Sequence, residues 1–486
     1  MITHDQLFID GAWTAPAGNE VIDVVSPSTE EVIGRVPQGT NADVDAAVAA
    51  ARKSFDSGPW ARMHPGERAA VIANIAKLLQ GRVEEIAKMV AQEAGSPLSF
   101  ALPAQAFAPT MIFDYYAQLA ERYPFEEVRQ GVLSPVIVRR EPVGVVAAVV
   151  AWNVPLFLIA AKMAPALLAG CSVVLKPAPE TPLNAFLFAD VCTEAGVPAG
   201  VVNIVPAHRD VSEYLVRHPG VDKVSFTGSS AAGRTIAGIC GEQLKRCSLE
   251  LGGKSAAILL DDADLSLIPT LVGAGIMNNG EACVAQTRIL APRSRYDDVV
   301  EAVGAAVGAL KVGDPLDMET AVGPLIAERQ RARVESYIES GRSEGARVVT
   351  GGGRPAGLDK GFYVEPTVFA DVDNKMRIAQ EEIFGPVLAV IPYDGEEQAV
   401  AIANDSDYGL AGSVWSADSA KALDVARQIR TGTMSINHYT IDFGAPFGGY
   451  KTSGLGREFG PEGLDTFVEL KSISVLPGTE IPGVTS

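Results

Sequence analysis

The chain has 486 residues, with 40 Lys and Arg against 59 Asp and Glu, which gives a net charge of −19 at pH 7. Hydrophobic residues make up 47% and charged residues 20% of the chain, a balance typical of a folded globular protein rather than a disordered one. The acidic excess argues against nucleic acid as a partner and against docking on anionic membranes, because both need clustered basic side chains. The five cysteines are too few, and odd in number, for a disulfide framework, and the five histidines form no close metal-ligand pair, so we expect no metal.

At about 150 residues per domain, this length predicts about three structural units. Residues 8–40 predict short strands separated by Gly, Pro and Asn. Residues 41–120 carry apolar side chains at three- and four-residue spacing, which predicts helices. The β-rich segment 132–140 predicts a protruding hairpin, and residues 467–475 predict one more strand before a Pro- and Gly-rich end.

An uncharged stretch runs from Pro142 to Ala161, long enough for a membrane-spanning helix. Because Asn153 and Pro155 interrupt it, we predict instead a strand at 143–151, a helix at 156–169 and a strand at 171–176. These elements form a βαβ unit whose strands are apolar on both faces. Strands and helices alternate to about residue 260 and again over 261–450, so the predicted fold class is α/β with parallel sheets. Residues 1–6 show no basic segment leading into an apolar run, and we expect the protein in the cytoplasm.

Cys283 follows a glycine turn, in Asn279-Gly-Glu-Ala-Cys283, and is the candidate nucleophile. A free thiol has a pKa of about 8.5, so a reactive one needs amide dipoles or a neighbouring base. The alternative is a buried structural cysteine, which is what we expect of the other four.

Glu250 lies between two leucines and is followed by two glycines. A buried glutamate has a raised pKa, which suits a general base near neutral pH. The alternative is a carboxylate that caps or pairs at the end of a strand.

Asn153 follows the first strand of the predicted βαβ unit, at the edge of an α/β sheet where ligands bind. Its amide can donate to an oxyanion, or its oxygen can cap the helix that begins near Pro155. Both interpretations remain open at the level of sequence.

Gly228 opens a segment, Gly228-Ser-Ser-Ala-Ala-Gly233-Arg-Thr235, that nearly matches the phosphate-binding loop of ATPases. Arg234 replaces the lysine of that loop, which argues against an ATPase. A strand, a tight turn and a helix start still suit one phosphate group at a helix N-terminus. The alternative is a tight helix entry without a ligand.

With these four features in place, the sequence resembles the aldehyde dehydrogenase superfamily, in its non-phosphorylating branch that oxidises aldehydes to acids. The similarity spans nearly the whole chain, and its motifs occur in the order found in the family. The segments that carry it are Phe8-Ile-Asp-Gly-Ala-Trp13, Leu249-Glu-Leu-Gly-Gly-Lys254, Gly280-Glu-Ala-Cys283, Glu381-Glu-Ile-Phe-Gly-Pro-Val387, residues 446–458 and Phe467-Val-Glu-Leu-Lys471.

The resemblance implies that Cys283 attacks the aldehyde carbonyl, and that the Asn153 amide and the Cys283 backbone N–H hold the oxyanion. Hydride transfer to a nicotinamide would leave a thioester, and Glu250 would activate the water that hydrolyses it. A thiol suits these steps because it is a strong nucleophile and a workable leaving group. Lys162 and Glu458 match family positions linked to proton relay.

The resemblance also implies a dinucleotide site, in which Lys176 and Glu382 contact the riboses and Ser229 contacts the pyrophosphate. Many NAD-preferring relatives have a glutamate three residues after the Lys176 position, where this chain has Pro179. The general preference of the family leads us to expect NAD. NADP is the alternative, because the missing carboxylate and Arg209 in a nearby loop could admit a 2′-phosphate. The cofactor-binding residues are expected to be Trp152, Lys176, Gly228, Ser229, Gly233, Leu251, Glu382 and Phe384.

The resemblance places apolar side chains around the nucleophile, with Ala161 where relatives often carry a bulky aromatic residue. It therefore implies a roomy apolar tunnel for medium-chain or aromatic aldehydes. The residues expected to form this tunnel are Val154, Phe157, Leu158, Ala161, Ala282, Val284, Tyr439 and Phe443. The rival function is a cofactor-independent cysteine hydrolase (thioesterase or amidase), which would leave the Gly228 turn without a role. A retired enzyme and a CoA-acylating relative are further alternatives, disfavoured by the presence of Cys283, Glu250 and Asn153.

The resemblance implies three units. A Rossmann-like NAD(P)-binding domain comprises residues 1–121 and 144–252, and an α/β catalytic domain comprises residues 253–463. A small β oligomerisation flap comprises residues 122–143 and 464–486. Exposed apolar strands in this flap favour self-association as a homodimer or homotetramer.

Overall fold

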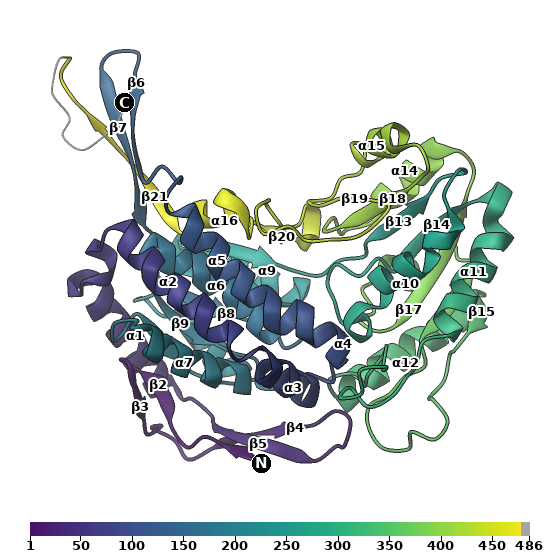
Figure 1. Cartoon of the computed structure of the whole chain (residues 1–486), viewed down its shortest axis with the longest axis horizontal. Helices are drawn as coiled ribbons and strands as arrows, with labels where there is room; N and C mark the ends of the chain where they lie inside the picture. Colours follow the sequence, from purple (N-terminus) through teal and green to yellow (C-terminus); the bar gives the residue numbers. More distant parts are fainter. Residues whose placement is uncertain (478–486) are drawn as a thin grey trace.

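The computed structural model describes residues 1–477 and has two large lobes, with a β arm projecting from one of them (Figure 1). The first lobe is built on an eight-stranded sheet whose central strands, β12 to β10, run parallel. In spatial order the strands are β20 (Gly454–Leu455), β12 (Arg246–Glu250), β11 (Lys223–Thr227), β8 (Val145–Val149), β9 (Ser172–Lys176), β10 (Val202–Ile204), β2 (Leu7–Ile9) and β3 (Ala12–Thr14). The short β20 returns from late in the chain and pairs antiparallel with β12.

Two layers of helices cover this sheet, because successive side chains of a strand point to opposite faces. Val146 and Ala148 of β8 pack against the layer of α2, α5, α6 and α7, whereas Val145 and Ala147 pack against α1, α8 and α9. The helices of this lobe are α1 (Asn41–Ser57), α2 (Pro65–Gln80), α3 (Val83–Ala94), α4 (Leu98–Phe100), α5 (Ala108–Leu119), α6 (Pro155–Ala169), α7 (Leu183–Ala195), α8 (Arg209–Arg217) and α9 (Ser230–Gln243).

The predicted βαβ unit is confirmed: β8, α6 and β9 follow one another, and β8 pairs parallel with β9. The uncharged stretch from Pro142 to Ala161 thus divides into a strand, a turn and the first half of a buried helix. Among the described residues, the structure has no helix of the length and apolarity needed to cross a bilayer.

The second lobe is built on a seven-stranded sheet that is parallel except for its edge strand β15. Its strands, in spatial order, are β15 (Arg347–Thr350), β16 (Thr367–Ala370), β17 (Val387–Tyr393), β14 (Arg288–Pro292), β13 (Ala256–Leu259), β18 (Gly412–Trp415) and β19 (Ser435–Ile436). Its main helices are α10 (Ile268–Ile276), α11 (Tyr296–Gly308), α12 (Glu328–Ser343), α14 (Glu396–Asn404) and α15 (Ser419–Ala426). The α/β fold with two parallel sheets is confirmed.

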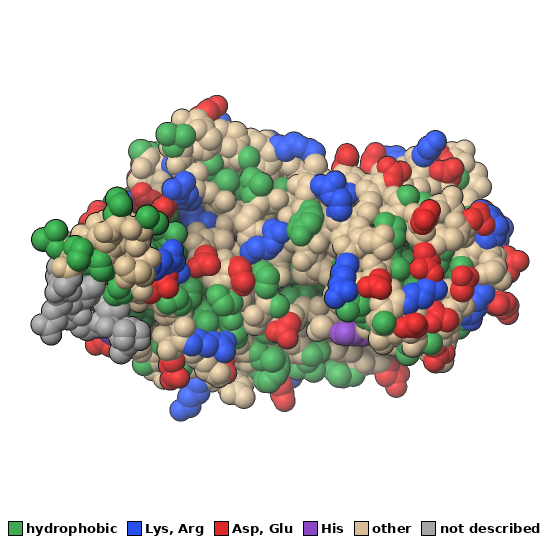
Figure 2. Space-filling model, turned by 90° about the horizontal axis from the view of Figure 1, so that it is seen from above, with side chains coloured by type: hydrophobic (Ala, Val, Ile, Leu, Met, Phe, Trp, Pro, Cys, Tyr) green, Lys and Arg blue, Asp and Glu red, His purple; other side chains and the backbone are tan. Residues whose placement is uncertain are grey.

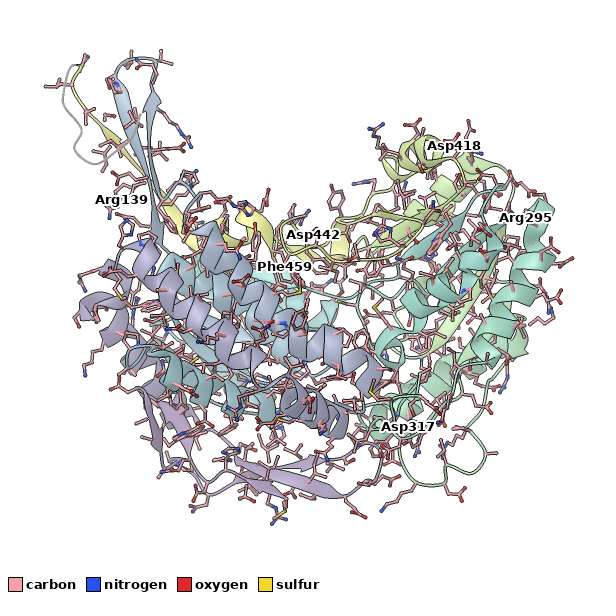
Figure 3. The ribbon with its side chains drawn as sticks, in the orientation of Figure 1. Arg139, Arg295, Asp317, Asp418, Asp442 and Phe459 are labelled. Carbon is pink, nitrogen blue, oxygen red and sulfur yellow. The ribbon has the colours of Figure 1, made fainter. Side chains whose placement is uncertain are left out.

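The arm is a three-stranded antiparallel sheet of β6 (Glu126–Gln130), β7 (Pro135–Pro142) and β21 (Val468–Ser474). It corresponds to the hairpin and the late strand predicted from the sequence, although β6 was not predicted. Val132 and Leu133 at its tip are fully exposed, and hydrophobic side chains gather on the arm in Figure 2. Residues 478–486 of the predicted flap lie outside the described residues. Figure 3 shows Arg139 on the arm, whereas Phe459 is wholly buried in the body of the protein.

Two smaller features complete the first lobe. A three-stranded sheet of β1 (Ile2–Thr3), β5 (Val32–Pro37) and β4 (Val21–Val25) lies at its N-terminal side. Between α4 and α5 the chain forms a π-helical turn, η2 (Ala101–Phe107), a feature often found near functional sites.

Candidate active site

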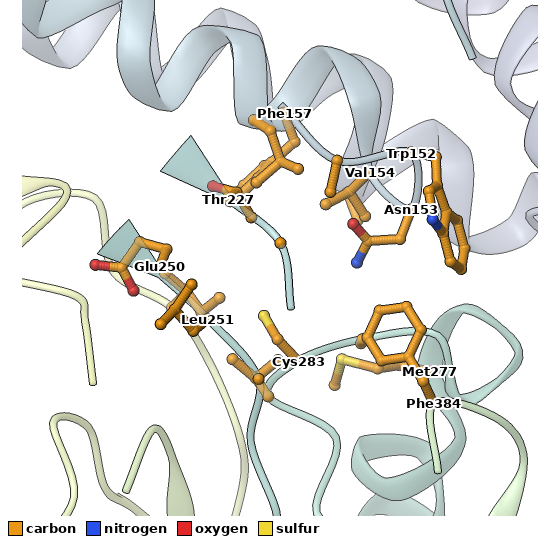
Figure 4. Close-up of a pocket in the computed structure, with 18 of the residues that line it drawn as sticks. Trp152, Asn153, Val154, Phe157, Thr227, Glu250, Leu251, Met277, Cys283 and Phe384 are labelled. Atoms are coloured by element: carbon orange, nitrogen blue, oxygen red, sulfur yellow. The ribbon is translucent and has the colours of Figure 1, made fainter. Parts of the chain in front are cut away.

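The main cavity, of about 550 Å³, lies between the two lobes. Three neighbouring parallel strands of the first sheet end at it: β8 leads to Trp152 and Asn153, β11 to Gly228, and β12 ends in Glu250. The second lobe contributes Cys283 from the opposite side (Figure 4). The carboxyl ends of parallel strands are where ligands bind in α/β sheets, and the volume is that of a small-molecule site.

Cys283 is half-buried and follows the short turn η4 (Met277–Gly280). Burial raises the pKa of its thiol, and the nearby carboxylates of Glu382, Glu250 and Glu458 raise that pKa further. Because its pKa lies above the usual value, the thiol is protonated at neutral pH. It must lose a proton before it can act as a nucleophile.

Glu250 is buried, and within residues 1–477 neither of its carboxylate oxygens has a hydrogen-bond partner. Burial, and then the charge of Glu458, raise the pKa of Glu250 well above its usual value. Figure 4 shows the carboxylate turned away from Cys283. It points toward Gly448, where an added Cβ would lie only 2.8 Å from Glu250 Oε1. A raised pKa makes the ionised carboxylate a stronger base, and because its oxygens have no partner within residues 1–477, the ionised form is suited to accept a proton from water.

Asn153 does not cap α6, because Val154 occupies the N-cap position and no side chain caps the helix. Its Nδ2 instead donates to the backbone carbonyl of Glu281 across 2.9 Å. An amide group has two N–H donors, so one remains free. In Figure 4 this amide faces the space beside Cys283, the geometry of an oxyanion-binding donor.

Lys162 and Glu458 form a buried ion pair with Nζ and Oε1 2.6 Å apart. Glu458 lines the cavity, whereas Lys162 lies behind it in α6. The pair therefore gives the buried Glu250 a charged, hydrogen-bonded neighbour.

The other end of the cavity fits a dinucleotide. Ser229 caps the 14-residue helix α9 by accepting a hydrogen bond from the Ala232 N–H, and an anion can bind at such a helix start. Leu251 packs so closely on Gly233 that an added Cβ there would lie 2.6 Å from it. Thr227 Oγ1 at the cavity wall has no partner among the described residues. The residues present can thus hold a phosphate and leave polar atoms for a ligand.

Glu382 and Phe384 approach this end from the second lobe. Glu382 Oε1 accepts a hydrogen bond from the Gly253 N–H at 2.9 Å, and burial raises the pKa of Glu382 to about 7. Trp152 and Phe384 meet edge to face, with ring centres 5.3 Å apart, and form one wall (Figure 4). Phe384 has a left-handed φ of 62°, a strained conformation of the kind found at functional sites.

Most of the predicted site residues line this cavity, but four do not, and one of the four is Lys162 of the ion pair described above. Lys176 and Gly233 lie behind the wall, and Ala161 is wholly buried in the core, so the prediction that Ala161 shapes the tunnel is wrong. Burial lowers the pKa of Lys176 to about 8, while the charge of Glu180 raises it. Glu180 in turn forms an ion pair with Arg329.

Several cavity residues could not be predicted from sequence motifs, because they come from elements far from the predicted site residues in the chain. Gln330 and Arg333 of α12 donate to the carbonyls of Phe384 and Glu382 and so hold the strained loop. The π-helical region supplies part of the apolar wall. The lining residues not predicted are Phe100, Ala104, Ala108, Ala151, Thr227, Gly252, Met277, Gln330, Arg333, Thr440, Ile441 and Phe447. No cluster of three metal-ligating side chains occurs within residues 1–477.

One cavity thus combines a thiol, an amide donor, a buried carboxylate and a helix start that can hold a phosphate. A profile described as the aldehyde dehydrogenase family matches residues 13–473. The chain belongs to this family, which confirms the resemblance and the enzyme class predicted from the sequence.

Individual relatives are similar to this chain over almost their full lengths. A geranial dehydrogenase from Castellaniella defragrans is 49% identical over 98% of this chain and 99% of its own. An aldehyde dehydrogenase from Mycobacterium tuberculosis, solved with NAD+, is 55% identical, with a TM-score of 0.98 over 99% of this chain and 100% of its own. Aldehyde dehydrogenase C from Pseudomonas syringae, a cysteine-to-alanine mutant solved with NAD+ and octanal, is 43% identical, with a TM-score of 0.95 over 98% of each chain.

Proposed function

We propose that this aldehyde dehydrogenase oxidises medium-chain or aromatic aldehydes to carboxylic acids with NAD, through a covalent intermediate on Cys283. The observation that carries the proposal is the common cavity of Cys283, Asn153 and Glu250, whose far end meets the helix start at Ser229. The relatives solved with NAD+ support the choice of cofactor.

In the proposed reaction, Cys283 Sγ adds to the aldehyde carbon after loss of its proton. The free N–H of Asn153 Nδ2 and the Cys283 backbone N–H donate to the oxygen that becomes negative. The dinucleotide, when bound, supplies the hydride acceptor that converts the thiohemiacetal into a thioester. Glu250 takes a proton from a water that attacks this thioester, which releases the acid and the thiol. The Lys162–Glu458 pair is suited to pass that proton onward.

The substrate class follows from the cavity wall on the side of Cys283. Its side chains are aromatic or aliphatic and leave space, since three of the positions are alanine. These residues are Phe100, Ala104, Ala108, Phe157, Leu158, Met277, Ala282, Val284, Ile441 and Phe443. Octanal, which is bound in the P. syringae relative, and geranial, for which the C. defragrans relative is named, support this choice of apolar aldehydes.

The remaining proposals concern organisation. We propose that the chain divides into a cofactor-binding domain (1–121 and 144–252), a catalytic domain (253–463) and a flap (122–143 and 464–486). The exposed apolar side chains of the arm support assembly into a homodimer or homotetramer. Five free cysteines suit the reducing cytoplasm.

The test is a comparison of kcat/KM for acetaldehyde, octanal and benzaldehyde, measured as reduced dinucleotide formed from NAD. The proposal predicts that octanal or benzaldehyde exceeds acetaldehyde by about tenfold or more, because each buried methylene is worth about 0.8 kcal/mol. Equal efficiency on all three would overturn the substrate class, and no NAD-dependent turnover would overturn the reaction.

A further inference from the structure

The turn that precedes the nucleophile has an unusual backbone. Asn278, Asn279 and Gly280 have consecutive left-handed φ angles of 52°, 62° and 73°. Asparagine tolerates this region better than other residues with a side chain, but two in succession still need support from their surroundings. Both asparagines are buried, so their amide groups must find protein partners.

The two asparagine side chains bond in different directions. Asn279 ties the turn to distant loops, because its Nδ2 donates to the carbonyls of Gly95 and Pro324, each at 3.0 Å. Asn278 bonds toward the reacting centre. Its Nδ2 donates to the backbone carbonyl of Asn153 at 2.9 Å and to that of Glu281 at 3.4 Å.

The Asn153 side chain completes a closed arrangement. Asn153 Nδ2 donates to the same Glu281 carbonyl that Asn278 contacts. Asn153 is therefore fixed at both its main-chain carbonyl and its side-chain amide, by two groups of one turn. The free N–H of Asn153 and the thiol of Cys283, two residues after Glu281, are set by the same hydrogen-bonded unit.

A second layer holds Asn278 itself. Its Oδ1 accepts a hydrogen bond from Gln105 Nε2 at 3.2 Å, and the same Nε2 donates to Ser96 Oγ at 2.8 Å. Gln105 is wholly buried and belongs to the π-helical turn η2. Ala104 of the same turn and Ala108 just after it line the substrate side of the cavity.

We infer that Asn278 is a positioning residue: its carboxamide holds Asn153 so that the free amide N–H points at the oxygen of the bound aldehyde. This inference rests on the oxyanion role of Asn153 in the proposed function. Small displacements of such a donor cost about 100-fold in rate. Replacement of Asn278 should then lower the reaction rate only in a protein that still has the Asn153 amide.

The test is a double-mutant cycle of Asn278→Gly and Asn153→Ala. Glycine keeps the left-handed backbone and removes only the amide. The readout is the pre-steady-state rate of reduced dinucleotide formation with octanal and NAD. Asn278→Gly is expected to lower this rate by about 10- to 100-fold in the wild-type background and by less than about threefold in the Asn153→Ala background. Equal losses in both backgrounds would overturn the inference.

Asn279→Gly is the matched control, since it makes the same change one residue later. It is expected to lower the midpoint of thermal unfolding while leaving the pre-steady-state rate within about threefold. An equal loss of rate in Asn279→Gly would show that any disturbance of the turn suffices, and would overturn the specific role of Asn278.

Gln105→Met provides a second route should Asn278→Gly not fold. This substitution removes the hydrogen bond from Gln105 to Asn278 Oδ1 without changing the residues of the turn. It should lower the pre-steady-state rate by less than Asn278→Gly does, and this loss should again disappear in the Asn153→Ala background. A loss that persists in that background contradicts the inference. If Asn153→Ala alone leaves the rate unchanged, the proposed oxyanion role fails as well, so the two failures are distinguishable.

Discussion

Lys162 Nζ lies 2.6 Å from Glu458 Oε1 in an ion pair that is almost completely shielded from solvent. A buried pair is costly to break, because the remaining charge loses its partner without gaining water. Glu458 faces the cavity next to Glu250, so a change in this ion pair should affect both the stability of the first lobe and the chemistry of the site.

The first prediction concerns this pair. Lys162→Met should lower the free energy of unfolding by about 3–5 kcal/mol, because it leaves Glu458 buried and unpaired. The double variant Lys162→Met with Glu458→Leu should recover most of that loss. Chemical denaturation of the three proteins measures it, and a double variant as unstable as the single one would contradict the account.

Glu250→Gln should separate the two halves of the reaction. Glutamine cannot accept a proton from water, so hydrolysis of the thioester should slow by about 10²- to 10⁴-fold. Rapid mixing with octanal and NAD should then show one equivalent of reduced dinucleotide followed by slow turnover. Intact mass of the quenched protein should show the acyl group on the chain. Unchanged steady-state turnover would remove Glu250 from the mechanism.

Glu180 should govern the choice between NAD and NADP. Its carboxylate is paired with Arg329 and close enough to Lys176 to raise the pKa of that lysine. The family resemblance implies that the adenosine ribose binds beside Lys176. A carboxylate there would repel a 2′-phosphate, and Arg329 would attract that phosphate once it is released from Glu180. Glu180→Gln should therefore raise kcat/KM for NADP by about tenfold or more relative to NAD. Arg209→Gln is the control, and a change in preference there instead would assign selectivity to the other loop.

Glu93 is buried away from the active-site cavity and should make the stability of the protein depend on pH. Burial raises the pKa of Glu93 from its usual 4.5 to about 8, against hydrogen bonds from Asn184 and Leu183. The folded protein holds this proton more tightly than the unfolded chain, so the free energy of unfolding falls as the pH rises from about 4.5 to about 8.

Glu93→Gln removes this titration. The stability of the wild type relative to the variant should decrease by several kcal/mol between about pH 5 and pH 8, as measured by urea denaturation at a series of pH values. Parallel pH profiles for the two proteins would show that Glu93 does not titrate in this range.

Much of the fold could be predicted because it is encoded locally. The strands on either side of α6 read as uninterrupted apolar runs, since both faces are buried, and Ser229 was a recognisable helix start. Long-range pairing was not encoded in this way. The return of β20 to the edge of the first sheet depends on a segment about 200 residues after β12.

In the candidate site, too, residues in local motifs could be predicted and residues placed by long-range contacts could not. Cys283, Glu250 and Asn153 were predicted from their motifs, but the cap alternative for Asn153 could be excluded only with its partner, Glu281, in view. Gln330 and Arg333 of α12 carry no motif and act through carbonyls that the sequence does not reveal. The prediction for Ala161 rests on the position of a bulky residue in relatives, and it fails because α6 is buried on all sides and turns Ala161 away from the cavity lining.

The most direct test of the central claim is the turnover of Cys283→Ala with octanal and NAD, followed by the absorbance of the reduced dinucleotide. Alanine removes the sulfur and, because Cys283 is half-buried and unpaired, leaves the surrounding hydrogen bonds intact. The account predicts that turnover falls by at least about 10³-fold while the variant keeps the unfolding midpoint and NAD affinity of the wild type. Retained turnover in this folded variant would contradict Cys283 as the nucleophile.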